Sequence, residues 1–312
     1  MSTRLLIDDR LGNVYELPHG KIEIKHARKS RAGSLEFEYF NKDEFQIKNG
    51  QIVRLEKDSS TVFYGYVFKV AKEKITCYDQ LRYLKFKDTK VFINKKATEI
   101  TQTIAKENGM KVGNIVDTKY VIPSQVSDDK EWLDMITEAL ETTLLATGRL
   151  YFLQDNVGQL ELLDVADTIL DIVIDGYGRL TDYDYSEDID SDTYNRIKLA
   201  KDNKETGKRE IYLYQDSSNI ARWGKLQYYE VVDEGLNEAK INEKGQSLLE
   251  LKNREKKTFS LKNAVGDIRC KAGYSVYISI PEEKIEGLYL IDSDAHKFED
   301  EEHLMDLELV VY

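Results

Sequence analysis

Three aspartates at alternate positions are the first side chains whose type and spacing could do chemistry: Asp188, Asp190 and Asp192. Oxygen ligands at alternate positions suit a hard cation, and this pattern resembles the first half of a calcium-binding loop. The second half is missing, because the sixth position is Thr193 instead of glycine and the twelfth is Leu199 instead of glutamate. A solvated acidic loop is therefore the favoured interpretation, and no cofactor is expected.

Two histidines, His296 and His303, lie seven positions apart in a region that predicts β-strand. Zinc sites usually use closer pairs or paired cysteines, so this spacing favours a structural hydrogen-bonding role for both side chains. Cys270 could complete a thiol–histidine pair with either of them. Its surroundings predict a strand and lack the helix N-terminus that lowers a thiol pKa, so nucleophilic catalysis is disfavoured.

The many acidic residues leave one enzymatic alternative open. The chain contains 57 aspartates and glutamates, and a pair that cleaves glycosidic bonds is recognised only by the separation of its carboxyl groups in a fold. A cell-wall-active hydrolase is therefore an alternative, although no phosphate-binding, serine-hydrolase or zinc-peptidase motif is present. The 20 tyrosines suit half-buried sheet faces or subunit contacts. If exposed, they would suit a carbohydrate-binding module, the second alternative.

Composition limits the classes of partner. The 312 residues carry a formal net charge of −12, which disfavours nonspecific nucleic-acid binding because that binding depends on lysine and arginine. No apolar run approaches the roughly 18 residues of a membrane-spanning helix, so membrane insertion is not expected. Cys77 and Cys270 are too few for a disulfide framework, and we expect two thiols in a reducing compartment.

Strand patterns near both ends of the chain predict the elements that hold these residues. Gly50 and Gly65 each lead a short run of alternating apolar residues near the N-terminus, and Gly273 and Gly287 do the same near the C-terminus. Glycine-led strands of this kind are typical of curved antiparallel sheets. We therefore predict two related β-barrels, an arrangement that favours assembly over catalysis.

The middle of the chain predicts helices. Apolar residues at helical spacing predict a short helix over 97–108 and a longer one over 132–148. The spacing of Asp128 and Glu131 predicts a capping pair at the start of the longer helix. A β-hairpin is predicted over 149–163, with a turn that ends at Gly158.

The last part of the chain predicts a mixed pattern. Residues 181–196 are acidic and rich in tyrosine, and they predict a connector between domains. Short strands are predicted at 197–200 and 211–214, followed by a helix at about 235–254 and by strands from 258 to the end. The whole pattern predicts an α+β, mainly β fold.

Three domains are predicted from these patterns. Residues 1–85 form the first tube-like barrel. Residues 86–175 form an α/β insert with two helices and a hairpin. Residues 176–312 form the acidic connector and the second tube-like barrel, which contains a helix.

Short motifs spread along nearly the whole chain resemble one protein family. The resembling segments are Phe63–Val67, Cys77–Leu81, Tyr151–Leu160, Tyr194–Ile197, Trp223–Gln227, and His296 with His303–Leu307. In order and spacing they are similar to phage tail baseplate hub proteins of the XkdQ-like family. The resemblance implies a fold similar to the contractile-tail hub and to the N-terminal part of VgrG spikes. It implies no catalytic residue and assigns structural roles to Gly50, Gly65, Asp79, Gly158, Asn195, Gly224, Gly273, Gly287, His296 and His303.

The resemblance also implies a function in assembly. Three subunits with two barrels each would present six quasi-equivalent barrels, a ring that joins a hexameric tail tube to a trimeric central spike. The implied partners are two further copies of the chain, the tube protein, the spike protein and baseplate wedge proteins. We expect assembly in the bacterial cytoplasm, in a phage tail or an R-type bacteriocin. The chain stops at Tyr312 after its last predicted strand, so wall cleavage is expected in a separate protein.

Overall fold

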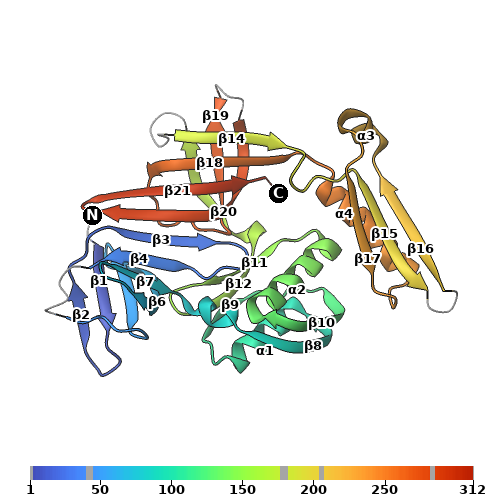
Figure 1. The fold of residues 1–312 in the computed structure, drawn as a ribbon. Helices are drawn as coiled ribbons and strands as arrows, with labels where there is room; N and C mark the ends of the chain where they lie inside the picture. Colours follow the sequence, from blue (N-terminus) through green and yellow to red (C-terminus); the bar gives the residue numbers. More distant parts are fainter. Residues whose placement is uncertain (1–2, 40–44, 176–181, 204–206, 282–284, 312) are drawn as a thin grey trace. The chain divides into compact units, whose positions relative to one another are not determined.

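The computed structural model describes residues 3–39, 45–175, 182–203, 207–281 and 285–311, and its structure is mainly β (Figure 1). The chain divides into two compact units. The larger, here called the sheet unit, comprises Met1–Glu141, Leu150–Asp184 and Phe259–Tyr312. The smaller, here called the small unit, comprises Thr142–Arg149 and Tyr185–Thr258.

Thirteen of the described strands form one large sheet. They are β1 (Thr3–Asp8), β2 (Val14–Leu17), β3 (Ile22–Ala27), β4 (Ser34–Glu38), β5 (Ile52–Lys57), β6 (Ser60–Val70), β7 (Lys74–Tyr78), β13 (Ile169–Asp175), β14 (Asp182–Asp188), β18 (Lys256–Val265), β19 (Ser275–Ile280), β20 (Ile285–Glu299) and β21 (Glu302–Val310). The main path runs β14-β18-β21-β20-β3-β4-β7-β6-β5-β1-β2, while β19 pairs with β20 and β13 with β19.

Alternating side chains turn one face of this sheet toward a core. In β3, Ile22 and Ile24 are fully buried, whereas Glu23 and Lys25 lie on the opposite face. Burial of an apolar side chain of this size contributes about 1.5–3 kcal/mol. The core cluster draws on β1 to β7 and on β20, and includes Leu5, Ile7, Leu17, Leu35, Phe37, Val53, Leu55, Phe63, Val67, Ile75, Cys77 and Phe298.

The N-terminal and C-terminal strands meet at the pair β3–β20. The register runs from Ala27 opposite Ser293 to Ile22 opposite Phe298, and Phe298 packs in the core cluster of the N-terminal strands. The predicted mainly β fold with antiparallel pairing is confirmed. The two predicted barrels are not confirmed, because strands from both ends of the chain share one sheet and the described residues form no closed barrel.

A helical insert follows β7, and it belongs to the sheet unit except for residues 142–149 at and after the end of α2, which belong to the small unit. Its elements are η1 (Gln80–Lys85), β8 (Lys87–Lys96), α1 (Ala97–Glu107), β9 (Val112–Ile115), β10 (Val121–Glu131), α2 (Trp132–Thr147), β11 (Tyr151–Asp155), β12 (Leu160–Asp164) and η2 (Val165–Asp167). The two predicted helices and the β11–β12 hairpin are confirmed. The predicted capping pair is wrong, because Asp128 and Glu131 belong to β10, which pairs with β8.

The small unit packs a helix against a three-stranded sheet. Its elements are β15 (Arg196–Asn203), β16 (Lys208–Gln215), α3 (Ser217–Trp223), β17 (Gln227–Val232) and α4 (Glu238–Lys252), with the order β16-β15-β17. The predicted strands and the last predicted helix are confirmed. Part of the predicted acidic connector is instead strand β14. The domain boundary at 85/86 stays a prediction, and the boundary at 175/176 falls at residues outside those described.

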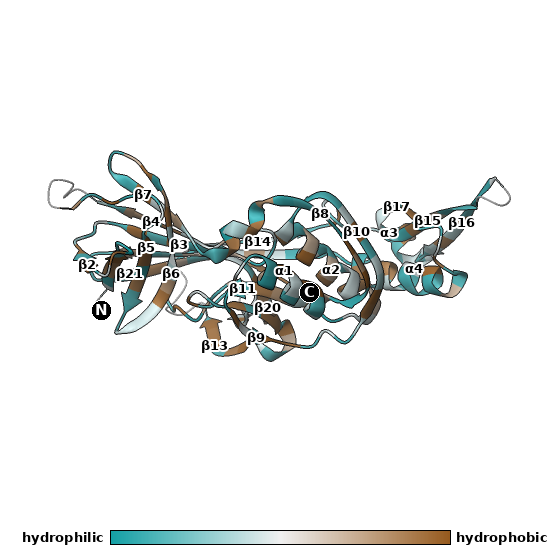
Figure 2. Cartoon of the chain, turned by 90° about the horizontal axis from the view of Figure 1, so that it is seen from below, coloured by the Kyte–Doolittle hydropathy of each residue, from teal (hydrophilic) through white to brown (hydrophobic). Residues whose placement is uncertain are grey.

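Apolar and polar residues interleave along the strands (Figure 2). Among the residues that the structure describes, no helix has the length and apolar composition to cross a membrane.

Candidate functional site

The positions singled out by the sequence lie in several parts of the fold. Two of the glycines occupy the same local structure in different halves of the large sheet. Gly50 N–H donates to Val67 O at 2.8 Å, and Val67 N–H donates to Gln51 O at 2.9 Å. Gly273 N–H donates to Ile291 O at 2.8 Å, and Ile291 N–H donates to the residue after Gly273 at 2.8 Å.

Each arrangement is a β-bulge in which a glycine and the next residue oppose one residue of the partner strand. Gly50 and Gly273 have φ values of 86° and 94°, which glycine adopts without steric cost. The second glycine of each pattern is not equivalent, because Gly65 lies opposite Val53 whereas Gly287 lies opposite Ile278. The repeated strand pattern therefore corresponds to a repeated bulge and hairpin, and the match ends there.

Three of the glycines also make room for a neighbour. A Cβ atom on Gly65 would overlap the backbone carbonyl of Tyr78, and one on Gly273 would overlap the ring of Phe152. Gly158 closes the β11–β12 turn, where a Cβ atom would lie 2.9 Å from the ring of Tyr64.

Asp79 joins the strands of the sheet unit to its insert. The carboxylate accepts hydrogen bonds from Gly33 N–H at 2.8 Å and from Leu81 N–H at 2.9 Å, and it begins η1. Burial raises the pKa of Asp79, and the nearby charge of Asp155 raises it further. Burial also raises the pKa of Asp155 to about 6, against hydrogen bonds from Gly158 and Gln80. These two carboxyl groups are a buried structural junction.

Asn195 and Gly224 meet in one turn of the small unit. Asn195 Nδ2 donates to Gly224 O at 2.7 Å, and its Oδ1 accepts from Leu226 N–H at 3.0 Å. Gly224 ends α3 with φ 78° and ψ −176°, a conformation that glycine adopts readily. The Asn195 side chain thus satisfies backbone groups between α3 and β17.

His296 and His303 form a buried chain of hydrogen bonds with Lys57. Lys57 Nζ lies 2.8 Å from His303 Nδ1, and His303 Nε2 lies 3.0 Å from His296 Nδ1. His296 Nε2 lies 3.0 Å from Cys270 O. An ammonium group only donates and a carbonyl oxygen only accepts, so the direction of every bond follows. Lys57 donates to His303, His303 to His296, and His296 to the carbonyl.

This direction requires both histidines to be neutral. A proton on His303 Nδ1 would face the ammonium group of Lys57, and a proton on His296 Nδ1 would face the N–H of His303. Burial lowers the pKa of His303 to about 3, and the positive charges that His296 and Lys57 can carry lower it further. Burial also lowers the pKa of His296, although the carboxylate of Asp294 works against it.

Asp294 links this region of β20 to His26 of β3. Its Oδ2 atom is 2.9 Å from His26 Nδ1, and its Oδ1 atom accepts from Ala272 N–H at 2.7 Å. Burial raises the pKa of Asp294, but His26 and the other hydrogen bonds outweigh it, and the net shift is downward. Sequence reasoning missed Lys57, His26 and Asp294. Only Lys57 carried a signal, because it continues the buried alternation of Val53 and Leu55.

Cys270 is poorly placed for the catalytic pair considered above. It lies in the loop between β18 and β19, so the predicted strand at this position is wrong. His296 Nε2 is 3.0 Å from the backbone carbonyl oxygen of Cys270. The buried histidines have their ring nitrogens engaged in the hydrogen-bond chain, which is a structural arrangement.

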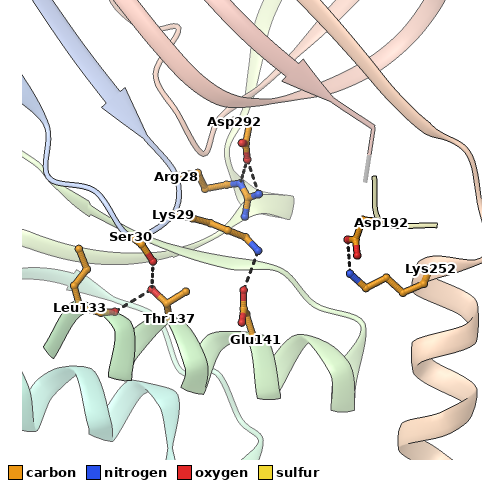
Figure 3. Close-up of polar contacts among 9 residues, drawn as sticks. All are labelled: Arg28, Lys29, Ser30, Leu133, Thr137, Glu141, Asp192, Lys252 and Asp292. Atoms are coloured by element: carbon orange, nitrogen blue, oxygen red, sulfur yellow. Dashed lines mark hydrogen bonds and ion pairs between the residues drawn. The ribbon is translucent and has the colours of Figure 1, made fainter. Parts of the chain in front are cut away.

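The acidic residues considered for calcium are engaged in a turn. Asp188 Oδ1 accepts hydrogen bonds from the backbone of Asp190 at 3.0 Å and of Ser191 at 2.9 Å. Asp192 forms an ion pair with Lys252 of α4 (Figure 3). No group of three or more potential metal ligands is found among the described residues.

The turn after β3 is tied to two other elements of the sheet unit (Figure 3). Arg28 Nη2 lies 2.6 Å from Asp292 Oδ1 in β20, and Lys29 Nζ lies 3.0 Å from Glu141 Oε1 in α2. Ser30 Oγ lies 3.5 Å from Thr137 Oγ1, also in α2. Beside this turn lies a groove of about 870 Å³, lined by residues of the turn and of β3, β4, β7, η1, β10, β18, β20 and β21.

Comparisons with known proteins point to one family. The model of the family described as YqbQ-like matches residues 22–310. The chain is 34% identical over 274 residues to the phage-like element PBSX protein XkdQ of Bacillus subtilis, which covers 85% of this chain and 83% of that protein.

Solved structures share the fold at low sequence identity. The 43 kDa tail protein of prophage MuSo2 from Shewanella oneidensis has a TM-score of 0.72 and 14% identity, and covers 99% of this chain and 98% of its own. The E. coli c3393 protein, a type VI secretion component, has a TM-score of 0.56 and 8% identity, and covers 99% of this chain and 76% of its own.

Proposed function

The chain belongs to the YqbQ-like family, and from this premise we propose that it is a structural hub in the baseplate of a contractile injection system. The particle is a phage tail or a phage-derived R-type bacteriocin. In this function three copies form a ring that joins the hexameric tail tube to the trimeric central spike. The chain carries no catalytic step.

The observation that carries the proposal is the repeated bulge. Gly50 and Gly273 begin hairpins with the same backbone hydrogen bonds, one in the N-terminal half of the large sheet and one in the C-terminal half. A protein with two quasi-equivalent halves presents six of them when three copies assemble. A ring of three subunits can thereby match a six-fold tube on one side and a three-fold spike on the other.

In finer detail, each half of the sheet belongs to one tube-like domain, and this domain completes its barrel only when the ring forms. The first unit is 1–85 and the second is 176–312, with the insert 86–175 between them. Ring formation covers strand edges that would otherwise pair without control. The glycines, Asp79, Asn195 and the two histidines hold the shape of these units and make no contact with a substrate.

The proposed partners follow from this position in the particle. They are two copies of the same chain, the tail tube protein, the central spike protein and the wedge proteins of the baseplate. The net charge of −12 opposes stable binding to nucleic acid. We propose assembly in the bacterial cytoplasm, without insertion of this chain into a membrane.

The test is the mass of the purified protein by light scattering, alone and mixed with the spike protein encoded beside it. The hub function predicts a trimer in at least one of the two samples. A monomer in both contradicts it. The two alternatives are then measured directly, since a wall hydrolase clears purified peptidoglycan and a carbohydrate-binding module is retained on glycan without cleaving it.

A further inference from the structure

Five aromatic rings gather on the outer side of the N-terminal strands, opposite the core. Tyr66 lies 5.4 Å from Tyr83 and 6.0 Å from Tyr64 between ring centroids, and Phe68 lies 5.5 Å from both Tyr78 and Tyr83. Most of these pairs are edge-to-face, a geometry that fixes ring orientation. The rings are only partly buried, and Tyr83 keeps 37% of its surface exposed. We call this set, together with Arg10, Arg54 and Arg82, the aromatic–arginine face.

The three arginines lie against these rings. The guanidinium carbon of Arg10 is 5.4 Å from the ring centre of Tyr66, and that of Arg82 is 5.6 Å from that of Phe68. Arg54 lies opposite Tyr64 in the β5–β6 ladder. Burial raises the pKa of Tyr64, whereas the charges of Arg54 and Arg10 work in the opposite direction.

None of these arginines has a carboxylate partner within ion-pair distance among the residues that the structure describes. By contrast, the outer face across β3, β20 and β21 is paired, with Lys25 at 2.8 Å from Glu23 and Lys297 at 2.6 Å from Asp306. Three guanidinium groups on one surface that have no ion-pair partner among the described residues keep donors available for carboxylates of another molecule.

Tyrosine and arginine dominate the energetics of protein interfaces. The rings and the arginine side chains already hold one another in place, so little conformational entropy remains to be lost on binding. A guanidinium group that lies on an aromatic ring still presents donors to a carboxylate, and it can bind both oxygens at once. The face is therefore suited to a protein surface that carries carboxylates.

The groove of about 870 Å³ extends this face, because Tyr78 and Arg82 line both. Its lining also includes small side chains such as Ala32 and Ser34, which leave space for side chains of a partner. Tyr66, Tyr78 and Ser34 lie in successive strands in one register row, so the face and the groove are parts of one sheet surface.

Other ligands fit this surface less well. Bases and sugars stack on open ring faces, but here arginines or the edges of neighbouring rings cover part of those faces. The charge of −12 also opposes nucleic acid. A second copy of this chain carries an excess of carboxylates and supplies the complementary charge.

We propose that the aromatic–arginine face binds an acidic surface of a second copy of this chain and is thereby a subunit contact of the assembly. The face cannot meet its own copy, because three arginines would then oppose three arginines. The contact is therefore between two different surfaces, which is the kind that closes into a ring of three. This inference rests on the trimer of the proposed function.

The test replaces Arg10, Arg54 and Arg82 together by glutamate and measures mass by light scattering over a range of protein concentration. The matched control replaces three exposed lysines of the insert by glutamate, Lys106, Lys111 and Lys119, and so makes the same change in net charge. We expect the native chain and the control to trimerise, and the arginine variant to dissociate at a concentration about 100-fold higher or more. Circular dichroism verifies that each variant is folded.

The single variant Arg10→Glu is measured in the same way, because Arg10 is exposed and its substitution leaves the core intact. We expect its trimer to dissociate at a concentration about 10-fold higher than the native one. If the native chain is a trimer and both arginine variants form equally stable trimers, the aromatic–arginine face is not a subunit contact. The proposed hub function is not affected by that result. A native chain that is monomeric both alone and with the spike overturns the trimer itself, and this inference with it.

Discussion

At the scale of single residues, the sheet unit contains buried polar groups whose hydrogen-bond partners determine their protonation states. Lys57, His303 and His296 form a chain in which each group donates to the next and the last donates to a carbonyl. A glutamine amide has an acceptor and a donor at a similar separation to the two nitrogens of imidazole, whereas leucine has neither. Glutamine and leucine at position 303 therefore distinguish the effect of the hydrogen bonds on stability from the effect of histidine protonation.

We expect His303→Gln to cost less than about 1 kcal/mol at pH 7, because the direction of both bonds is kept. His303→Leu removes the hydrogen-bond partner of the buried Lys57 ammonium group and of His296 Nδ1, and it is expected to cost about 3 kcal/mol or more. The free energy of unfolding in urea measures both. Equal costs for the two variants would contradict the assigned bond directions.

The same position predicts a dependence on pH. Unfolded histidine titrates near 6.5, whereas the folded pKa of His303 is lowered to about 3. Between these values the unfolded state binds more protons, so His303 makes stability fall as pH falls through this window. Asp155 acts in the opposite sense, because its folded pKa is raised to about 6. The comparison of variants is therefore more informative than the native curve.

The loss of stability from pH 7 to pH 5 is expected to be smaller in His303→Gln than in the native chain, because one of the two depressed histidines is gone. Urea unfolding at both pH values gives the difference. The control is Lys74→Gln, which removes a surface cation paired with Glu36 and should leave the pH slope nearly unchanged. A steeper slope in His303→Gln would refute the neutral histidine.

The two bulge glycines offer a matched pair. Both have a positive φ, so alanine costs about 1–2 kcal/mol at either position from backbone strain alone. At Gly50 a Cβ atom meets nothing within 4 Å, whereas at Gly273 it overlaps the ring of Phe152. We expect Gly273→Ala to be the more destabilising by about 1–3 kcal/mol. Thermal unfolding of the two variants measures it, and equal losses would mean that the Phe152 ring moves aside freely.

At the scale of elements, the sequence was informative where one local signal decided the structure. The helical stripe of α2 and the glycine after it fixed that helix. Local sequence signals were misleading where pairing with a distant strand determined the structure. Asp128 and Glu131 imitate a helix cap, but pairing with β8 draws them into β10. The alternation in β3 buries Ile22 and Ile24, yet nothing local specifies β20 as the partner strand.

The candidate site shows the same division. Gly50 and Gly273 were recognisable, because a bulge requires a glycine at a defined place in a strand pattern. His26 and Asp294 were not recognisable, since 268 residues separate two groups that lie 2.9 Å apart. The aromatic–arginine face was visible only as a high tyrosine count. Which tyrosines share a surface depends on the register of β6 with β7.

Helix α4 contains a glycine whose role contradicts helix propensity. In an ordinary helix interior, Gly→Ala stabilises by about 1 kcal/mol. Gly245 is buried, and a Cβ atom there would overlap the ring of Tyr214 from β16. We therefore expect Gly245→Ala to destabilise the small unit by about 1–3 kcal/mol, measured by hydrogen exchange of the α4 amides.

A double-mutant cycle isolates the contact. In a Tyr214→Ala background the ring is gone, so Gly245→Ala should become neutral or stabilising. Gln246→Ala, at the exposed next position, is the control and should change stability by less than about 0.5 kcal/mol. If Gly245→Ala stabilises the native background as well, the close contact with Tyr214 does not limit packing.

At the scale of the whole sheet unit, β3 and β20 decide whether the two halves are independent. Their ladder lies at the middle of the strand path, with Phe298 packed in the core of the N-terminal strands. If this junction is tight, the N-terminal and C-terminal strands open together. Ile24 is fully buried in β3 and pairs with His296 of β20. The Ile24 side chain packs in the core of the N-terminal strands, and its backbone pairs with β20. A substitution of Ile24 therefore acts at the junction through the N-terminal core.

We expect Ile24→Ala to lower the free energy of exchange by about 2–5 kcal/mol, and by the same amount for amides of β5, β6, β20 and β21, because one cooperative unit shares every loss. Hydrogen exchange of the native chain and the variant measures it strand by strand. Leu162→Ala, in the core of the insert, is the control for a perturbation away from the junction. A loss confined to β5 and β6 would mean that the halves unfold separately, as two predicted domains would. A shared loss would mean that the strands from both ends of the chain open as one cooperative body through the β3–β20 ladder. In the proposed ring, each subunit would then contribute its two halves as one rigid body.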